Sequence, residues 1–186
     1  LSLIVMMVSM TTSYAQKQLV LYFSETGTTK TVAQELQKQL GADIEEIEAV
    51  VPYSGNFQET IQRGQRDMQN GEMPAIKPLK KKIADYDIIF LGYPIWFGTY
   101  ANPIITLVKE QDFAGKTIVP FCTFGSGGLN TSSDALKKAL PKATIKKGYG
   151  VRTARVNAAA KELDRFLKEN GIARSEERRV GKECRS

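Results

Sequence analysis

The sequence predicts a three-layer α/β fold, in which a doubly wound parallel sheet of five strands lies between helices. Three observations predict it. Short apolar runs alternate along the chain with segments of helical periodicity, the strongest runs are apolar at nearly every position, and no repeat or long linker divides the chain. Strands buried on both faces have such continuous apolar sequences. At 186 residues, one domain is expected.

Five segments are expected to form the strands of that sheet. Residues 18–23, 87–92 and 117–124 are the apolar runs expected at its centre. Residues 42–49 and 144–151 are more polar, which is typical of edge strands. In doubly wound sheets ligands bind at the carboxyl ends of the strands. The loops that follow the strands are therefore where chemistry is expected.

Helical periodicity fills the segments between these strands. After the first strand the pattern stops at Gly41, a residue type that commonly ends helices. Asn102 followed by Pro103 is a typical cap and first turn of a later helix. The apolar residues expected to face the core from these two helices are Val32, Ala33, Leu36, Leu40, Ile104, Ile105, Leu107 and Val108.

Three more helices are expected. Ser132 or Ser133 could cap one of them, and another covers residues 57–68, although Gly64 interrupts its pattern. The last helix is expected to stop at residues 170–171. The core-facing positions of the first and last of these three are Leu136, Ala139, Leu140, Val156, Ala159, Leu163, Phe166 and Leu167.

Both ends of the chain are expected to lie outside this domain. Residues 1–15 combine an apolar run with a small-x-small ending, which predicts a signal peptide, truncated at its start, and export to the periplasm. The alternative is an extra buried strand in a cytoplasmic protein. The run is shorter than the roughly 20 apolar residues that cross a bilayer, so no stable membrane insertion is expected. Residues 174–186 resemble a translated sequencing adapter, which leaves residues 16–173 as the folded domain.

Composition excludes several kinds of site. The chain has no histidine, which excludes Ser-His-Asp and Cys-His catalysis and the HExxH metalloproteases. Cys122 and Cys184 alone cannot build a zinc cage, so no metal is expected. The net charge is +6, from 26 Lys and Arg against 20 Asp and Glu. Lysine runs such as residues 80–82 and 146–147 are expected to be solvated surface rather than a nucleic-acid site.

The first strand is followed directly by SETGTT, residues 24–29, here called the hydroxyl loop. Hydroxyls and backbone N–H groups at the positive end of a helix dipole suit a phosphate. An ordinary capped turn would use the same residue types. The loop lacks the GxxxxGK[ST] and GxGxxG spacings, and Glu25 alone is not the carboxylate cluster of a phosphoreceiver domain.

Two other strands are followed by unusual sequences. Residues 93–100 (YPIWFGTY), here called the aromatic segment, hold the only Trp and are expected to form an irregular loop on which a planar ring could stack. Residues 123–128 (TFGSGG), here called the glycine-rich loop, would let backbone amides approach a ligand edge closely. Alternatively, the aromatic segment only covers the top of the core, and the glycine-rich loop is only a flexible surface loop.

Taken together, these three sequences resemble the flavodoxin family, and SETGTT is similar to its S-x-T-G-x-T phosphate signature. The resemblance covers most of residues 16–173 and implies a sheet of strand order 2-1-3-4-5 that binds FMN. It implies that the phosphate lies on Ser24, Glu25, Thr26, Gly27, Thr28 and Thr29. It further implies that the isoalloxazine ring lies between two groups, which are Pro94, Ile95, Trp96, Phe97 and Gly98, and Thr123, Phe124, Gly125, Ser126 and Gly127.

The resemblance implies an electron-transfer protein that serves redox partner proteins. The alternatives are an FMN-dependent reductase of a small acceptor such as a quinone, and a flavin-free binding module of the same fold. The chain is mildly basic, whereas flavodoxins are usually acidic. Its glycine-rich loop lacks the tyrosine that many of them stack on the outer flavin face, and Phe124 is the displaced alternative to it. The missing aromatic cover favours the reductase, and the intact hydroxyl loop argues against the module. Residues 52–78 form a long polar connection in which Tyr53, Arg63 and Arg66 are expected near the site.

Overall fold

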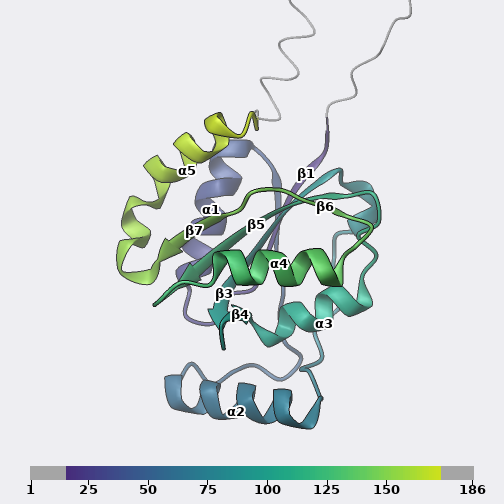
Figure 1. The fold of residues 1–186 in the computed structure, drawn as a ribbon, viewed down its shortest axis with the longest axis vertical. Helices are drawn as coiled ribbons and strands as arrows, with labels where there is room; N and C mark the ends of the chain where they lie inside the picture. Colours follow the sequence, from purple (N-terminus) through teal and green to yellow (C-terminus); the bar gives the residue numbers. More distant parts are fainter. Residues whose placement is uncertain (1–15, 173–186) are drawn as a thin grey trace, which may run out of the picture.

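The computed structural model describes residues 16–172 (Figure 1), so the predicted signal peptide and the predicted tail lie outside the described residues. None of the helices between residues 16 and 172 is long and apolar enough to cross a membrane. The elements in chain order are β1 (Gln18–Tyr22), α1 (Thr28–Leu40), β2 (Asp43–Glu46), α2 (Phe57–Asn70), η1 (Ile83–Asp85), β3 (Ile88–Trp96), β4 (Thr99–Tyr100), α3 (Asn102–Glu110), β5 (Thr117–Phe124), α4 (Leu129–Ala139), β6 (Thr144–Ile145), β7 (Tyr149–Arg152), η2 (Thr153–Ala158) and α5 (Ala159–Glu169).

The strands form one sheet in the order β2-β1-β3-β5-β6, and β7 pairs with β5 beyond β6. Each of these pairs is parallel. β5 is the fourth expected strand and β6 with β7 the fifth, so the predicted doubly wound sheet of order 2-1-3-4-5 is confirmed.

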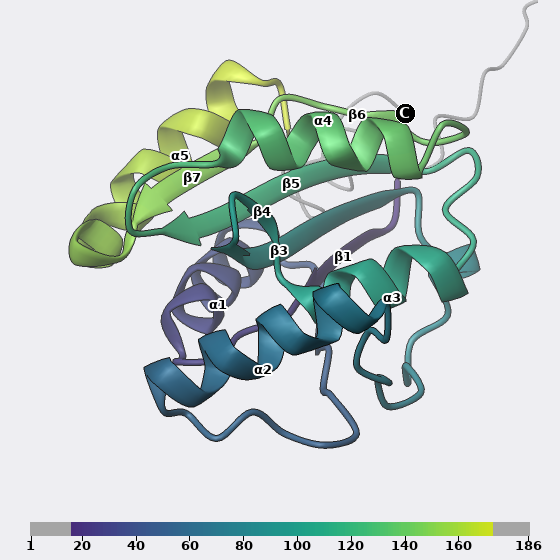
Figure 2. The same cartoon turned by 60° about the horizontal axis from the view of Figure 1, so that its bottom comes forward.

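The central strands are apolar throughout because both faces of the sheet are covered by helices (Figures 1 and 2). Successive side chains of a strand point to opposite faces. Leu19 and Leu21 therefore pack with the buried side chains of α3 and α4, while Val20 and Phe90 pack with those of α1 and α5. The result is two apolar cores, one on each side of the sheet.

The fifth expected strand, residues 144–151, is interrupted, and the prediction of one continuous strand was wrong. Thr117 of β5 pairs with Thr144, which is 27 residues later in the chain, whereas Phe121 pairs with Tyr149, which is 28 residues later. The edge segment of β6 and β7 therefore has one residue more than the stretch of β5 that it pairs with. The break lies beside Pro120, which has no N–H to donate to a neighbouring strand. Gly148 fits there because a Cβ would lie 2.6 Å from the Pro120 carbonyl oxygen.

The aromatic segment is a hairpin, so the prediction of an irregular loop was wrong. β3 continues to Trp96, and β4 returns antiparallel to it with Trp96 opposite Thr99. The two residues between them, Phe97 and Gly98, have φ angles of 50° and 81°. Two consecutive positive φ angles define the tight turn that matches the twist of paired strands.

Two predicted helix caps were wrong. The N-cap of α3 is Ala101, and the side chain of Asn102 instead donates to a carbonyl of α2. α4 starts earlier than expected, with Gly128 as its N-cap. Ser132 is buried inside that helix, where its hydroxyl bonds the Leu129 carbonyl and the Tyr93 hydroxyl. In both cases a tertiary partner takes the polar group that a cap would use.

Helix α2 lies apart from the three layers, beyond the carboxyl ends of the strands (Figures 1 and 2). It runs unbroken through Gly64, and its only buried residues are Thr60 and Gly64. A Cβ on Gly64 would lie 2.9 Å from the Phe97 ring. The glycine that weakens the helical pattern is thus the position at which the hairpin contacts the helix.

Candidate functional site

The three predicted sequences meet at one cavity of about 490 Å³ at the carboxyl ends of β1, β3 and β5. Of the predicted site residues, Ser24, Gly27, Gly98, Ser126 and Gly127 lie in the same turns but do not line it. The predicted residues that do line it are Glu25, Thr26, Thr28, Thr29, Pro94, Ile95, Trp96, Phe97, Thr123, Phe124 and Gly125.

The hydroxyl loop presents unused backbone donors to this cavity. Gly27, with a φ of 85°, leads into α1 and makes no side-chain cap bond. The Ser24 hydroxyl accepts from the Lys30 N–H at 3.2 Å, while the N–H groups of Thr28 and Thr29 have no acceptor among residues 16–172. The start of a helix with free N–H groups attracts an anion. Ser24 therefore bonds within the turn, and the N–H groups of Thr28 and Thr29 beside it are left for a ligand.

The threonine hydroxyls of the loop are partly used within the protein. Thr26 and Thr28 lie within hydrogen-bond distance of each other, with 3.3 Å between their Oγ1 atoms. The buried Thr29 hydroxyl bonds the Thr123 hydroxyl at 2.8 Å. This second bond joins the hydroxyl loop to the end of β5, so it fixes the spacing of two walls of the cavity.

Trp96 is held edge-on by two other rings. Its centroid lies 5.7 Å from that of Phe23 and 4.9 Å from that of Tyr53, with interplanar angles of 89° and 76°. Such edge-to-face pairs are favourable. The Arg63 guanidinium lies 4.1 Å from the centre of the Tyr53 ring. Trp96 is therefore a braced wall of the cavity.

Some residues of the cavity wall were not predicted from the sequence. In the connection of residues 52–78, Tyr53, Arg63 and Arg66 were expected near the site, but none of them lines the cavity. A usable signal was Phe57, an apolar residue that directly follows the capping residue Asn56. The lining residues that were not predicted are Gly55, Phe57, Thr60, Ile61 and Thr153.

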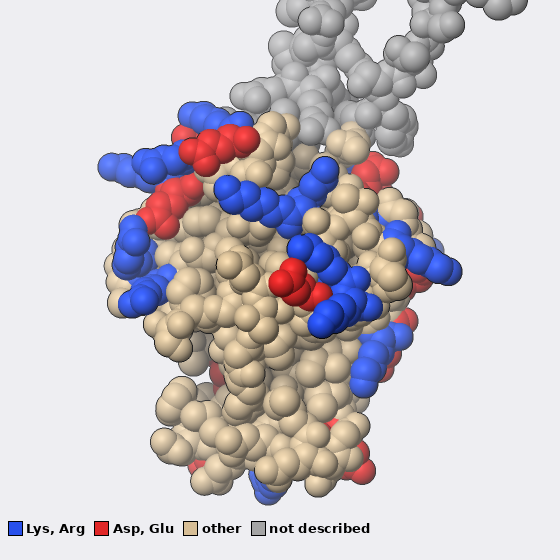
Figure 3. Space-filling model, viewed as in Figure 1, with Lys and Arg blue, Asp and Glu red and all other residues tan. Residues whose placement is uncertain are grey.

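The cavity has little charge. Glu25 is the one charged side chain among its lining residues, and its carboxylate accepts from the Gly55 N–H and the Thr60 hydroxyl. In Figure 3 Lys and Arg gather over the upper part of the molecule, and the lower part, where α2 lies, shows few charged side chains. Phe57 and Phe97 are 74% and 41% exposed, so two apolar rings border the opening to solvent.

The described residues offer little other chemistry. No group of three or more Cys, Asp or Glu residues between residues 16 and 172 is arranged to hold a metal ion. Burial raises the pKa of the Cys122 thiol to about 12, and burial also raises the pKa of Tyr93. A thiol that stays protonated is a poor nucleophile. Neither Cys122 nor Tyr93 is among the residues that line the cavity.

Known proteins share this fold and sequence. Residues 17–168 match the family model described as Flavodoxin. A protein of Bacteroides eggerthii designated a flavoprotein is 35% identical with a TM-score of 0.67, and the match covers 77% of this chain and 94% of that one. A Bacteroides uniformis protein with the same designation is 28% identical with a TM-score of 0.70, covering 81% of this chain and 99% of that one.

Two further proteins are similar to this chain at lower identity. A Lactobacillus acidophilus flavoprotein solved in complex with FMN shares the fold, with 21% identity, a TM-score of 0.65 and coverage of 78% of this chain and 99% of that one. Flavodoxin 1 of Salmonella typhimurium is 26% identical over 106 residues, which are 55% of this chain and 46% of the relative. This chain thus matches about half the length of its curated relatives. The family match over residues 17–168 and the shared topology show that the chain belongs to the flavodoxin family, which supports FMN as its cofactor.

Proposed function

We propose that this protein binds FMN and transfers electrons between redox partners. One observation carries the proposal: a single cavity has unpaired N–H groups and hydroxyls at one end and aromatic and apolar side chains along the rest. FMN has the same division, with a phosphate at one end and a planar ring at the other. The residues present therefore fit the cofactor that the family uses.

The chain's own residues would bind, orient and shield the cofactor. The N–H groups of Thr28 and Thr29 would donate to the phosphate at the positive end of the α1 dipole. Trp96 and Phe97 on one side and Phe124 on the other would flank the ring and keep water from its faces. Bound FMN supplies the electron-transfer chemistry, and the protein supplies position and electrostatic environment.

The phosphate assignment is tested by comparing FMN with riboflavin, which lacks the phosphate. We expect FMN to bind much more tightly, and the Thr26→Ala and Thr28→Ala variants each to lose about 1–3 kcal/mol of FMN binding, or roughly tenfold to a hundredfold in affinity. Titration of the apoprotein, followed by flavin or Trp96 fluorescence, measures both. Equal affinity for the two flavins would contradict the assignment.

A second candidate function is reduction of a small uncharged acceptor, such as a quinone, at the same site. The observation that favours it is the opening itself, which is bordered by the exposed rings of Phe57 and Phe97. Stopped-flow reoxidation of the reduced FMN complex separates the two functions. Saturable kinetics with a neutral quinone, weakened by Phe57→Ala and insensitive to salt, favour the reductase. Unsaturated quinone kinetics, together with salt-dependent electron transfer to a carrier protein, favour the electron carrier.

We also propose that the protein is exported, on the basis of the apolar run and small-x-small ending in residues 1–15. Expression of the full-length gene in a bacterial host, followed by fractionation and mass measurement, tests it. Processing before Gln16 in the periplasmic fraction is expected. An unprocessed cytoplasmic product would contradict export.

A further inference from the structure

We propose that Glu25 is a positioning residue that holds the start of α2 against the cofactor site, so that phosphate in the hydroxyl loop and docking of α2 stabilise each other. The inference rests on the FMN site proposed above. It assigns a role to the connection of residues 52–78, which the flavin site by itself does not explain.

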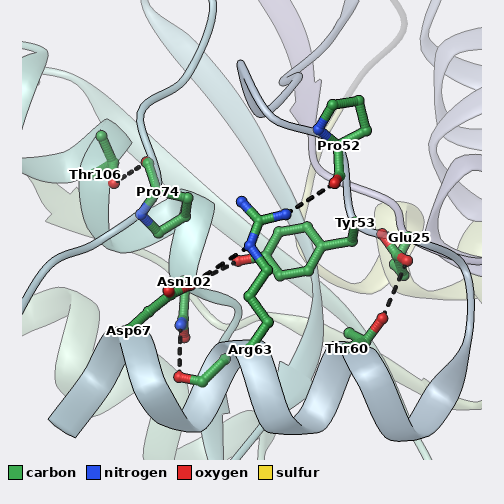
Figure 4. A network of polar contacts seen from close by, with 10 residues as sticks. Glu25, Pro52, Tyr53, Thr60, Arg63, Asp67, Pro74, Asn102 and Thr106 are labelled. Carbon is green, nitrogen blue, oxygen red and sulfur yellow. Dashed lines mark hydrogen bonds and ion pairs between the residues drawn. The ribbon is translucent and has the colours of Figure 1, made fainter. Parts of the chain in front are cut away.

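Glu25 belongs to the hydroxyl loop, but its carboxylate points to the connection before α2 (Figure 4). Its Oε1 accepts from the Gly55 N–H at 3.0 Å and from the Thr60 Oγ1 at 3.3 Å. These two donors lie on either side of the helix start, where Asn56 is the N-cap. The carboxylate therefore lies beside the positive end of the α2 dipole, which stabilises a negative charge. One side chain joins the predicted phosphate loop to a separate helix.

Helix α2 has few apolar contacts that could hold its first turns. Thr60 and Gly64 are its only buried residues, and Phe57 and Met68 are 74% and 42% exposed. Segments with little apolar burial open locally at a low free-energy cost. Hydrogen bonds to charged groups are stronger than neutral ones. The Glu25 contacts are therefore a large part of what holds the first turns of α2.

The other anchors of this region lie elsewhere along it (Figure 4). The Asn102 amide donates to the Gly64 carbonyl at 3.0 Å in the middle of the helix, and the Thr106 hydroxyl donates to the Pro74 carbonyl beyond its end. Before the helix, Tyr53 contacts the Trp96 ring, and the Arg63 guanidinium donates to the Pro52 carbonyl at 2.8 Å. None of these contacts reaches the hydroxyl loop. Glu25 is thus the contact that makes α2 sensitive to what the loop binds.

The coupling follows from charge. A bound phosphate monoester carries about −1.5 to −2 charges at pH 7. While α2 is docked, the negative charge of Glu25 is matched by the two donors at the helix start. If α2 opened, the carboxylate would lose both donors and remain in the loop beside the phosphate, where two like charges repel. Phosphate therefore penalises the open state, so FMN should hold α2 more firmly than riboflavin does.

Hydrogen–deuterium exchange of the α2 amides tests the anchor in the apoprotein. The variants are Glu25→Ala, which removes the acceptor, Glu25→Gln, which keeps an acceptor oxygen without charge, and Glu59→Ala as a matched control. Glu59 lies on the same helix, and its carboxylate has no partner among the described residues. We expect exchange in the first half of α2 to rise about tenfold or more in Glu25→Ala, since two hydrogen bonds are lost. Glu59→Ala should stay within about threefold of the wild type, and Glu25→Gln should lie between the wild type and Glu25→Ala, because a neutral acceptor makes weaker hydrogen bonds.

The same measurement with each flavin at equal occupancy tests the coupling. In the wild type, FMN should slow α2 exchange more than riboflavin does, and in Glu25→Gln the two flavins should slow it equally. Unchanged α2 exchange in apo Glu25→Ala would overturn the anchor. Equal protection by the two flavins in the wild type would overturn the coupling.

The anchor can still be tested if Glu25→Ala does not fold or if the wild type binds no flavin. If Glu25→Ala does not fold, Thr60→Val takes its place, because it removes one donor while keeping the side-chain shape. Its α2 exchange should rise about threefold or more, and no rise would overturn the anchor. If the wild type binds neither flavin, the proposed function fails and the coupling fails with it, while the apoprotein comparison still decides the anchor.

Discussion

The sandwich of sheet and helices and the α2 region are held together by different forces. In the sandwich, apolar strand residues such as Phe90 and Leu91 are completely buried between helices. In α2 only Thr60 and Gly64 are buried, and the helix is attached through hydrogen bonds and ring contacts. Burial of apolar surface contributes far more to stability than a few hydrogen bonds and ring contacts do. We infer that the sandwich sets the stability of the protein and that α2 responds to the site.

The largest change in the free energy of unfolding should come from a substitution in the core of the sandwich, compared with one on α2. Phe90→Ala empties a fully buried position between the sheet and its helices, so it should lower the free energy of unfolding by about 3–5 kcal/mol. Met68→Ala on α2, at a position that is 42% exposed, should cost less than about 1 kcal/mol. Urea unfolding measures both. Similar losses at the two positions would mean that α2 is as much a part of the core as the sheet.

A smaller loss of stability is expected when the hydrogen bond between Thr29 and Thr123, which joins two walls of the cavity, is broken. Thr29→Val leaves the buried Thr123 hydroxyl without its partner, so it should cost about 1–3 kcal/mol of stability. The double variant Thr29→Val/Thr123→Val removes both polar groups and should recover most of that loss. Urea unfolding of the three proteins checks this. A double variant that is less stable than the single one would contradict the pairing.

Alkaline pH should weaken the sandwich through Cys122. Burial raises the pKa of its thiol to about 12, whereas an unfolded thiol ionises near pH 8.5. Above that pH the unfolded state binds fewer protons than the folded state, so stability falls as pH rises, by about 1.4 kcal/mol per pH unit for this group up to pH 12. The Cys122→Ala variant should lose correspondingly less stability between pH 9 and 11. Parallel losses in the two proteins would show that the folded thiol ionises normally.

The smallest effect lies at the contact between the hairpin and α2. Phe97 holds a φ of 50°, a conformation that Asn tolerates better than Phe in this kind of turn. Phe97→Asn should therefore change the free energy of unfolding by only about 0.5 kcal/mol, as turn relief offsets the lost contact with Gly64. Its FMN affinity should nevertheless fall about tenfold, because a wall of the cavity is gone. Normal affinity, measured by flavin titration, would remove Phe97 from the site.

The sandwich could be predicted because its signals are local. Continuous apolar runs at residues 18–23, 87–92 and 117–124 indicated strands buried on both faces, and Gly41 ended the first helix as expected. The hydroxyl loop was equally local, since its residues, the strand before it and the helix after it are contiguous. The three site sequences could be placed together because the carboxyl ends of parallel strands share one edge of a sheet.

The α2 side of the site could not be predicted in the same way. Gly64 weakens a helical pattern, and its reason, the Phe97 ring, lies 33 residues further along the chain. Asn102 has the sequence of a cap but donates to that same glycine's carbonyl. Pro120 interrupts a ladder with a strand that follows it in the chain. Each of these roles depends on a partner that is distant in sequence.

What the sequence alone determined is the layered sheet, its order as implied by the family resemblance, and the loop expected to hold a phosphate. These follow from periodicity and backbone chemistry within a few neighbouring residues. The hairpin in the aromatic segment, the split edge strand and the place of α2 depended on tertiary contacts. Their sequences are polar or glycine-containing, so local preference is weak, and the conformation is set by whichever distant group satisfies the buried hydrogen bond or fills the space beside it.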